Sequence, residues 1–128
     1  MKIYTSYFAK LESIRKAGII PVGIALYKPQ WFTGSSAYSL APMPKMFHGS
    51  ITQEKYIELY QKEILDNINL YALQEQFKVF SAGQDIALLC YEKPGEFCHR
   101  HLFAKWFNGK TGFVVEEFEQ PKTSLALF

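Results

Sequence analysis

The hydrophobic positions of the chain fall into short runs that predict strands. Residues 2–8 are rich in β-branched and aromatic side chains, which favour extended backbone. Residues 19–27 and 85–90 are almost continuously apolar, a pattern typical of strands buried on both faces of a parallel sheet. A last strand is expected within residues 112–119.

Between these runs, apolar residues recur at the spacing of a helix. The predicted helices cover residues 10–17, a stretch that begins near Ser50 or Thr52, residues 71–82 and residues 98–107. Ser50, followed three residues later by Gln53, suits a capping box at the start of the second helix. Glycine signals mark the expected ends of the other three helices, at Gly18, Gly83 and Asn108-Gly109.

The order of these elements is β-α-β, a loop, α-α and then β-α-β. Strands that alternate with helices favour a parallel sheet covered on both faces, with right-handed crossovers. The sequence therefore predicts an α/β fold: a single compact three-layer domain around a mostly parallel sheet of about four strands. This domain is expected to span residues 1–119, and residues 120–128 are expected to form a C-terminal tail.

The segment between the second strand and the second helix, residues 28–49, differs from the rest of the chain. It is rich in proline, glycine and serine and predicts a long irregular loop, and loops of this length are often functional. It also contains several aromatic and apolar side chains, among them Trp31 and Phe32. One interpretation is that this aromatic loop, residues 31–47, docks a macromolecular partner.

Composition narrows the class of protein. The chain has 128 residues, of which 48% are hydrophobic, and a formal net charge of +2, which describes a folding globular domain and argues against a nucleic-acid-binding protein. The longest apolar run, residues 19–27, is too short to span a bilayer. No membrane association is therefore expected. Two cysteines and no signal-peptide pattern fit a cytoplasmic protein, and association into a homo-oligomer is left open.

Candidate chemistry gathers in residues 90–101, which contain both cysteines and two of the three histidines. Cys98 falls at a predicted helix N-terminus, where the helix dipole stabilises a thiolate, and Arg100 adds positive charge. The same features suit the binding of a phosphate or carboxylate. Cys90, at the end of a buried strand, is expected to behave as a small apolar residue.

A metal site in this segment is not predicted. His99 and His101 would point to nearly opposite sides of a helix that turns about 100° per residue. Cys98 and His101 could share an ion, and Cys90 would be a third ligand. Their spacing matches none of the usual zinc patterns. The sequence therefore predicts no metal and no other cofactor.

Residues 85–107 resemble the domain-of-unknown-function 488 (DUF488) family. The resemblance rests on a strand that ends in Cys90, on Glu92 two residues later, and on Cys98-His99-Arg100 at the start of a helix. It implies a compact α/β fold and a site around these five residues, without a settled activity. Many members carry an acidic residue and an arginine at the end of the second strand, where residues 23–27 of this chain are uncharged.

The leading functional hypothesis is binding of a small anionic, nucleotide-like ligand at the carboxyl edge of the sheet, where parallel α/β folds bind ligands. Arg100 at the helix N-terminus would hold the acidic group. Planar parts of the ligand would stack on aromatic side chains, with Lys28 adding charge. The other predicted ligand-binding residues are Ser6, Tyr7, Tyr27, Trp31 and Cys90.

The second hypothesis is a cysteine-dependent enzyme. Cys98 would be its nucleophile and either His99 or His101 the base. Glu92, at the expected rim of the site, would act as a further acid or base.

Overall fold

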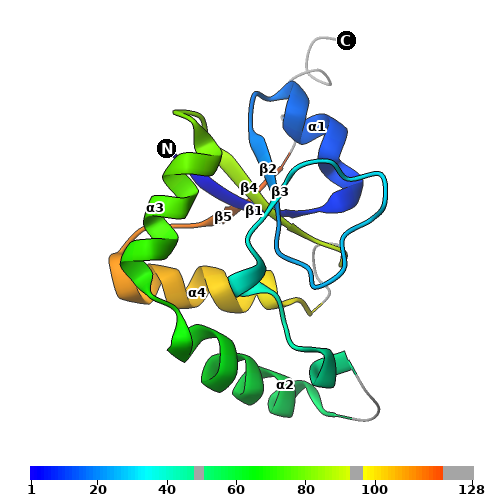
Figure 1. Ribbon diagram of the computed structural model, residues 1–128, viewed down its shortest axis with the longest axis vertical. Helices are drawn as coiled ribbons and strands as arrows, with labels where there is room; N and C mark the ends of the chain where they lie inside the picture. Colours follow the sequence, from blue (N-terminus) through cyan, green and yellow to red (C-terminus); the bar gives the residue numbers. More distant parts are fainter. Residues whose placement is uncertain (48–50, 93–96, 120–128) are drawn as a thin grey trace.

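In the part of the chain that the structure describes, five parallel strands form one sheet in the order β3-β2-β4-β1-β5 (Figure 1). The computed structural model describes residues 1–47, 51–92 and 97–119. The strands are β1 (Ile3–Tyr7), β2 (Ile20–Gly23), β3 (Ser35–Ser36), β4 (Ile86–Cys90) and β5 (Glu116–Glu117). The predicted α/β class and parallel sheet are confirmed, with five strands in place of about four.

Within the described residues, four α-helices accompany the sheet: α1 (Leu11–Lys16), α2 (Gln53–Leu59), α3 (Leu70–Ser81) and α4 (His99–Thr111). A π-helical turn, Tyr60–Ile64, and a 3₁₀ turn, Leu65–Asn67, continue α2. Shorter 3₁₀ helices cover Phe8–Lys10, Tyr38–Leu40 and Pro44–Phe47. Among the described residues, none of the helices is both long and apolar enough to cross a membrane.

The core has two parts, one on each face of the sheet. Along β4, Ile86, Leu88 and Cys90 join a cluster that contains Phe77 of α3 and Phe103 of α4. The residues between them, Ala87 and Leu89, join a second cluster with side chains of α1. Every residue of β4 is therefore buried, which is why its sequence is a continuous apolar run and not an alternating one.

Several predicted boundaries were wrong. β2 ends at Gly23, so residues 24–27 leave the sheet. The segment expected to be wholly irregular contains β3, whose two serines carry no hydrophobic pattern. The last predicted strand shrinks to the two residues of β5.

The end of α4 also differs from the prediction. The helix passes through Asn108-Gly109 and ends at Thr111. Its C-cap, Gly112, has a left-handed φ of 74°, and the Gly112 N–H donates to the carbonyl oxygen of Asn108 at 2.7 Å. Glycine adopts this conformation without steric cost. At the other predicted boundary, Thr52 caps α2 by accepting a hydrogen bond from the Lys55 N–H at 3.0 Å. Ser50 and the predicted tail, residues 120–128, lie outside the described residues.

The sheet register brings three strand ends to one edge. Tyr7 of β1 pairs with Cys90 of β4, and Gly23 of β2 pairs with Leu89. The chain then leaves β2 through Ile24, whose N–H donates to the carbonyl oxygen of Leu89 at 2.9 Å. Because α4 also begins near this edge, the segments that carry the candidate chemistry meet there.

Candidate functional site

A pocket of about 450 Å³ opens at the carboxyl edge of β2 and β4. Its walls come from the exit of each strand, the start of α4, helix α2 and the loop before α2. The lining residues are Ala25, Leu26, Tyr27, Pro42, Pro44, Tyr56, Cys90, Tyr91, Glu92, Phe97, Cys98 and His99. Most of these side chains are aliphatic or aromatic, and Glu92 has the one carboxylate among these described residues. The pocket is therefore largely apolar.

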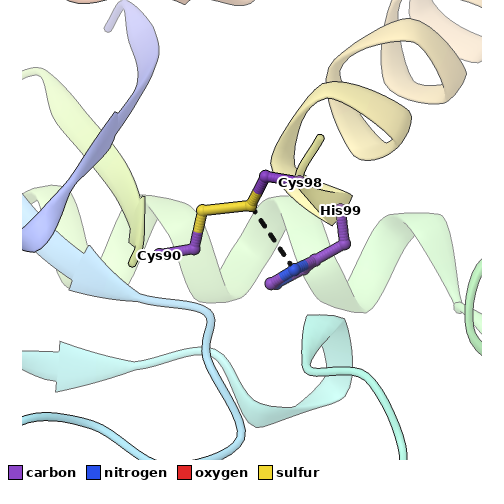
Figure 2. Close-up of side chains that lie close together, drawn as sticks. All are labelled: Cys90, Cys98 and His99. Atoms are coloured by element: carbon purple, nitrogen blue, oxygen red, sulfur yellow. Dashed lines mark hydrogen bonds between the residues drawn. A yellow bond between two sulfur atoms is a disulfide. The ribbon is translucent and has the colours of Figure 1, made fainter. Parts of the chain in front are cut away.

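Cys90 and Cys98 form a disulfide beside this pocket (Figure 2). Cys90 is the last residue of β4 and Cys98 is the N-cap of α4, and both are buried. Their Cα atoms lie 7.5 Å apart. Cys98 was expected to be a free thiolate and Cys90 a small apolar residue. Because the two sulfurs are bonded to each other, the expectation of a free Cys98 thiolate is wrong for this form of the protein.

The backbone that follows β2 holds the His99 side chain in place. Its Nε2 lies 2.8 Å from the carbonyl oxygen of Ile24, and its Nδ1 lies 3.7 Å from Cys98 Sγ (Figure 2). Because a carbonyl oxygen can only accept, Nε2 carries the proton and Nδ1 presents its lone pair to the sulfur. Burial lowers the pKa of His99 to about 4; the hydrogen bond to Ile24 opposes this effect, and the charges of Arg100 and His101 add to it. The imidazole is therefore neutral near pH 7.

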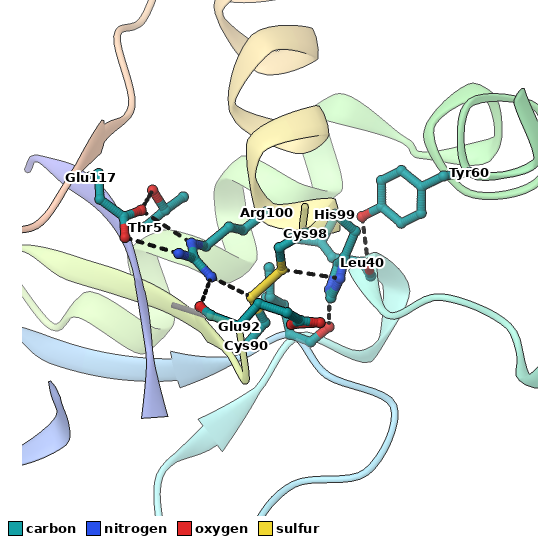
Figure 3. The surroundings of a disulfide bond; sticks show 10 residues. Thr5, Leu40, Tyr60, Cys90, Glu92, Cys98, His99, Arg100 and Glu117 are labelled. Atoms are coloured by element: carbon teal, nitrogen blue, oxygen red, sulfur yellow. Dashed lines mark hydrogen bonds and ion pairs between the residues drawn. A yellow bond between two sulfur atoms is a disulfide. The ribbon is translucent and has the colours of Figure 1, made fainter. Parts of the chain in front are cut away.

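Arg100 does not face the pocket, which corrects the prediction that it binds an external anion. Its side chain is fully buried, and all three guanidinium nitrogens donate to protein groups (Figure 3). Nε and Nη2 bind the carboxylate of Glu117, while Nη1 binds Cys90 Sγ at 2.8 Å and the Glu92 carbonyl oxygen at 2.6 Å. Thr5 completes the arrangement by donating from Oγ1 to Glu117 Oε1 at 2.7 Å.

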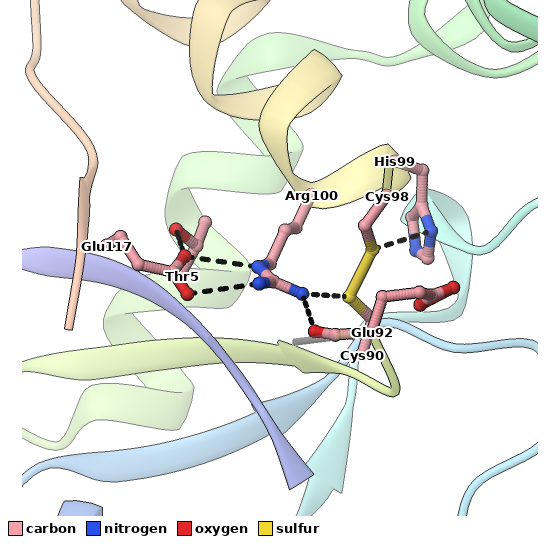
Figure 4. Close-up of polar contacts among 7 residues, drawn as sticks. All are labelled: Thr5, Cys90, Glu92, Cys98, His99, Arg100 and Glu117. Atoms are coloured by element: carbon pink, nitrogen blue, oxygen red, sulfur yellow. Dashed lines mark hydrogen bonds and ion pairs between the residues drawn. A yellow bond between two sulfur atoms is a disulfide. The ribbon is translucent and has the colours of Figure 1, made fainter. Parts of the chain in front are cut away.

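Glu92 places its carboxylate on the His99 side of the disulfide, away from Arg100 (Figure 4). Its Oε2 is buried and has no hydrogen-bond partner among the described residues. The pKa of Tyr56, on α2, is raised well above its usual value, mainly by burial and to a smaller extent by the negative charge of Glu92. The phenol of Tyr56 therefore stays protonated in the neutral pH range.

Tyr56 is held in turn by neighbouring aromatic rings. It stacks on Tyr60 with ring centroids 6.3 Å apart and meets the edge of Phe97 at 5.1 Å. The Tyr60 hydroxyl donates to the Leu40 carbonyl oxygen at 2.6 Å (Figure 3). These contacts attach α2 to the loop before it and so complete the far wall of the pocket.

The structure brings together five of the predicted site residues at the pocket, namely Tyr27, Cys90, Glu92, Cys98 and His99. Six others lie outside its lining. Ser6 is fully buried within β1, Tyr7 has its ring 6.0 Å from the Arg100 guanidinium carbon, and Arg100 is enclosed. The remaining three, Lys28, Trp31 and His101, are exposed.

The exposed aromatic residues of the 31–47 loop leave the docking hypothesis open. Trp31 and Tyr38 are each 59% exposed, whereas Phe32, Leu40 and Met46 are buried in the core. Part of the loop thus anchors it to the body. A partner for the exposed part stays a prediction.

The comparison with protein families gives a match over most of the chain. The model of the DUF488-N3a family, described as the active DUF488-N3 subclade, matches residues 14–111. The chain belongs to the DUF488-N3a family. Neither the curated proteins nor the solved structures gave a match.

The matched region of this DUF488-N3a protein includes every residue that lines the pocket, and the resemblance that the sequence analysis inferred is confirmed. The pocket residues that were not predicted from the sequence are Ala25, Leu26, Pro42, Pro44, Tyr56, Tyr91 and Phe97. Tyr56 carried a signal, because it is a polar aromatic residue on a helix that follows the long loop, but its spacing is equally that of a core residue.

Proposed function

We propose that this protein binds a small, planar, nucleotide-like ligand in the pocket at the carboxyl edge of the sheet, and that it holds the uncharged nucleoside part of the ligand. The observation that carries the proposal is a buried carboxylate oxygen, Glu92 Oε2, which has no hydrogen-bond partner among the described residues and lies in the wall of an apolar pocket of about 450 Å³. Pockets of this size and character are typical of small-molecule sites.

The shape and lining of the pocket favour a flat, apolar ring system. Tyr27 and Tyr91 stand at its rim and are 70% and 52% exposed, and Tyr56 and Phe97 form its aromatic inner wall. Aromatic faces stack on nucleobases without requiring a particular base. The aromatic residues that support stacking therefore differ from the predicted set, which shares only Tyr27 with them.

The carboxylate of Glu92 favours a ligand that donates hydrogen bonds. An ionised carboxylate can only accept, and a buried acceptor without a donor is costly. A base amino group or a ribose hydroxyl would satisfy Glu92 Oε2. A phosphate would be repelled by Glu92 and would find Arg100 already occupied by Glu117. The proposal therefore moves the recognition of the ligand from its acidic group to its nucleoside part.

Calorimetric titration tests this proposal with three kinds of probe: the four common ribonucleosides, their 5′-monophosphates and inorganic phosphate. We expect at least one nucleoside to bind, its monophosphate to bind no more tightly, and inorganic phosphate not to bind. Glu92→Gln should weaken nucleoside binding about 10–100-fold, since a hydrogen bond to a charged group contributes about 1.5–3 kcal/mol.

Glu119→Gln removes the same charge from an exposed position outside the pocket and should leave binding unchanged. Binding of phosphate alone, or equal affinities in the Glu92→Gln and Glu119→Gln variants, would contradict the proposal. The cysteine-enzyme alternative needs a free thiol, which the disulfide form described here does not offer.

A further inference from the structure

Three atoms that can bind a metal ion lie close together in residues that line the pocket. Cys90 Sγ, Cys98 Sγ and a ring nitrogen of His99 all lie within 4.8 Å of one another, and all three residues are buried. We propose that, once the two cysteines are reduced, these residues form a binding site for Zn²⁺ that keeps one coordination position open to the pocket.

The distances already approach those of a metal site. Cys98 Sγ and His99 Nδ1 are 3.7 Å apart. In a tetrahedral zinc site, bond lengths of about 2.3 Å to sulfur and 2.0–2.1 Å to nitrogen place these two ligand atoms about 3.5 Å apart. An ion could therefore join Cys98 and His99 with little movement of either side chain.

The orientation of His99 supports the same inference. Its Nε2 proton is committed to the Ile24 carbonyl oxygen at 2.8 Å, and a hydrogen bond of this kind orients metal-binding histidines in general. Nδ1 therefore aims a lone pair at Cys98 Sγ, but a disulfide sulfur has no proton to donate. Among the described residues, the oxidised pair thus leaves the buried Nδ1 facing a sulfur that cannot donate to it, and a bound cation would satisfy this acceptor.

Arg100 supplies a second group of the type found around metal ligands. Its Nη1 donates to Cys90 Sγ at 2.8 Å. A guanidinium proton stabilises a thiolate far more than a neutral sulfur, so this contact suits the ionised form of Cys90 that a metal requires.

The backbone leaves room for the sulfurs to separate. The Cα atoms of Cys90 and Cys98 are 7.5 Å apart, whereas bridged cysteines usually span about 4.4–6.8 Å. Going from the disulfide to the metal site takes two electrons and two protons, which a phosphine reductant and water supply while the phosphine becomes its oxide. Each resulting thiol then loses its proton as its sulfur binds Zn²⁺.

The position of the site suggests an open coordination sphere. Cys90, Cys98 and His99 all line the pocket, and zinc held by three protein ligands with a fourth position free is the arrangement of catalytic sites. Water, or a nitrogen or oxygen atom of a pocket ligand, would take the fourth position. The inference does not depend on the proposed nucleoside binding, because metal content is measured without any ligand.

The test uses the full chain, reduced with a phosphine, freed of reductant under nitrogen and loaded with Zn²⁺ or Co²⁺. We expect one Zn²⁺ per chain by elemental analysis, and a sulfur-to-metal charge-transfer absorption for the Co²⁺ form. Cys98→Ser and His99→Gln should lose the bound metal. The matched control is His101→Gln, whose imidazole is exposed two residues along the same helix, and this variant should retain the metal.

Reduction itself is verified by the mass gain of two hydrogens, so a failure to bind cannot be attributed to a surviving disulfide. Reduced wild-type protein that binds no Zn²⁺ would overturn the inference even if the variants failed to fold. Equal loss of metal in the His99→Gln and His101→Gln variants would also overturn it. Nucleoside titration in the presence of a chelator tests the proposed function separately.

Discussion

Arg100 and Glu117 are joined by two parallel hydrogen bonds, from Nε to Oε1 at 3.1 Å and from Nη2 to Oε2 at 3.0 Å (Figure 4). The Arg100 side chain is completely buried and that of Glu117 is 21% exposed. This fork-to-fork geometry is the strongest form of an ion pair between side chains. It ties the start of α4 to β5, the short strand at the edge of the sheet, and makes Arg100 a structural residue.

The first prediction concerns this pair. Arg100→Met should destabilise the fold by about 3–5 kcal/mol, because removing one partner of a buried pair leaves the other charge uncompensated. Glu117→Gln should cost less, about 1–3 kcal/mol, because the amide oxygen of glutamine still accepts a hydrogen bond from the buried Arg100 guanidinium. The double variant should be more stable than Arg100→Met alone. Urea denaturation measures all three, and a cost for Arg100→Met below that of Glu117→Gln would contradict this account.

The second prediction concerns the hydroxyl of Tyr60. Tyr60→Phe should cost about 1–2 kcal/mol at neutral pH, because the buried Leu40 carbonyl oxygen loses its donor. Burial, and then the neighbouring Tyr56, raise the pKa of Tyr60 above its ordinary value of 10.0. The folded state therefore favours the protonated phenol, whose contribution to stability is complete below pH 10 and is lost as the pH rises above it.

The Tyr60→Phe variant lacks this titration. Its free energy of unfolding should fall less steeply than that of the wild type between pH 9 and pH 11. Urea denaturation at a series of alkaline pH values measures both slopes. Parallel slopes for the two proteins would show that Tyr60 does not titrate differently on folding.

The third prediction concerns the end of α3. Ala82 has a φ of 48° and ψ of 40°, the left-handed conformation that an L-residue with a Cβ adopts at a cost. Ala82→Gly should therefore stabilise the protein by about 0.5–1 kcal/mol, even though glycine has the more flexible unfolded state. Thermal unfolding checks the sign. The matched substitution Gly83→Ala, at a φ of 87°, should destabilise, and a loss of stability in both variants would count against the argument.

Much of the fold was predictable because its longer strands can be recognised from the local pattern of apolar residues. The run at 85–90 became β4, buried on both faces, since both sides of a central strand are filled mainly by apolar side chains. The two-residue strands β3 and β5 could not be predicted, because Ser35–Ser36 and Glu116–Glu117 have no hydrophobic pattern. They pair with the sheet only because the rest of the fold places them beside it.

The structure places five of the predicted site residues in the lining of the pocket at the carboxyl edge of the sheet, but it gives several of the predicted residues contacts that the sequence did not suggest. Helical spacing placed His99 and His101 on opposite sides of α4, yet it could not say which side faces the pocket. The burial of Arg100 depends on Glu117, an acidic residue in a segment without a pattern. The pairing of Cys90 with Cys98 depends in turn on how the end of β4 meets the start of α4, which is a property of the tertiary fold.

The central claim is that the pocket beside Cys98 and His99 is where this protein binds a nucleoside-like ligand. Amide NMR spectra recorded during titration with the tightest-binding nucleoside test it most directly. We predict that the perturbed signals are those of pocket residues such as Ala25, Leu26 and His99, while the exposed indole of Trp31 is unaffected. Perturbations centred on Trp31, or none at a saturating concentration of nucleoside, would contradict the claim.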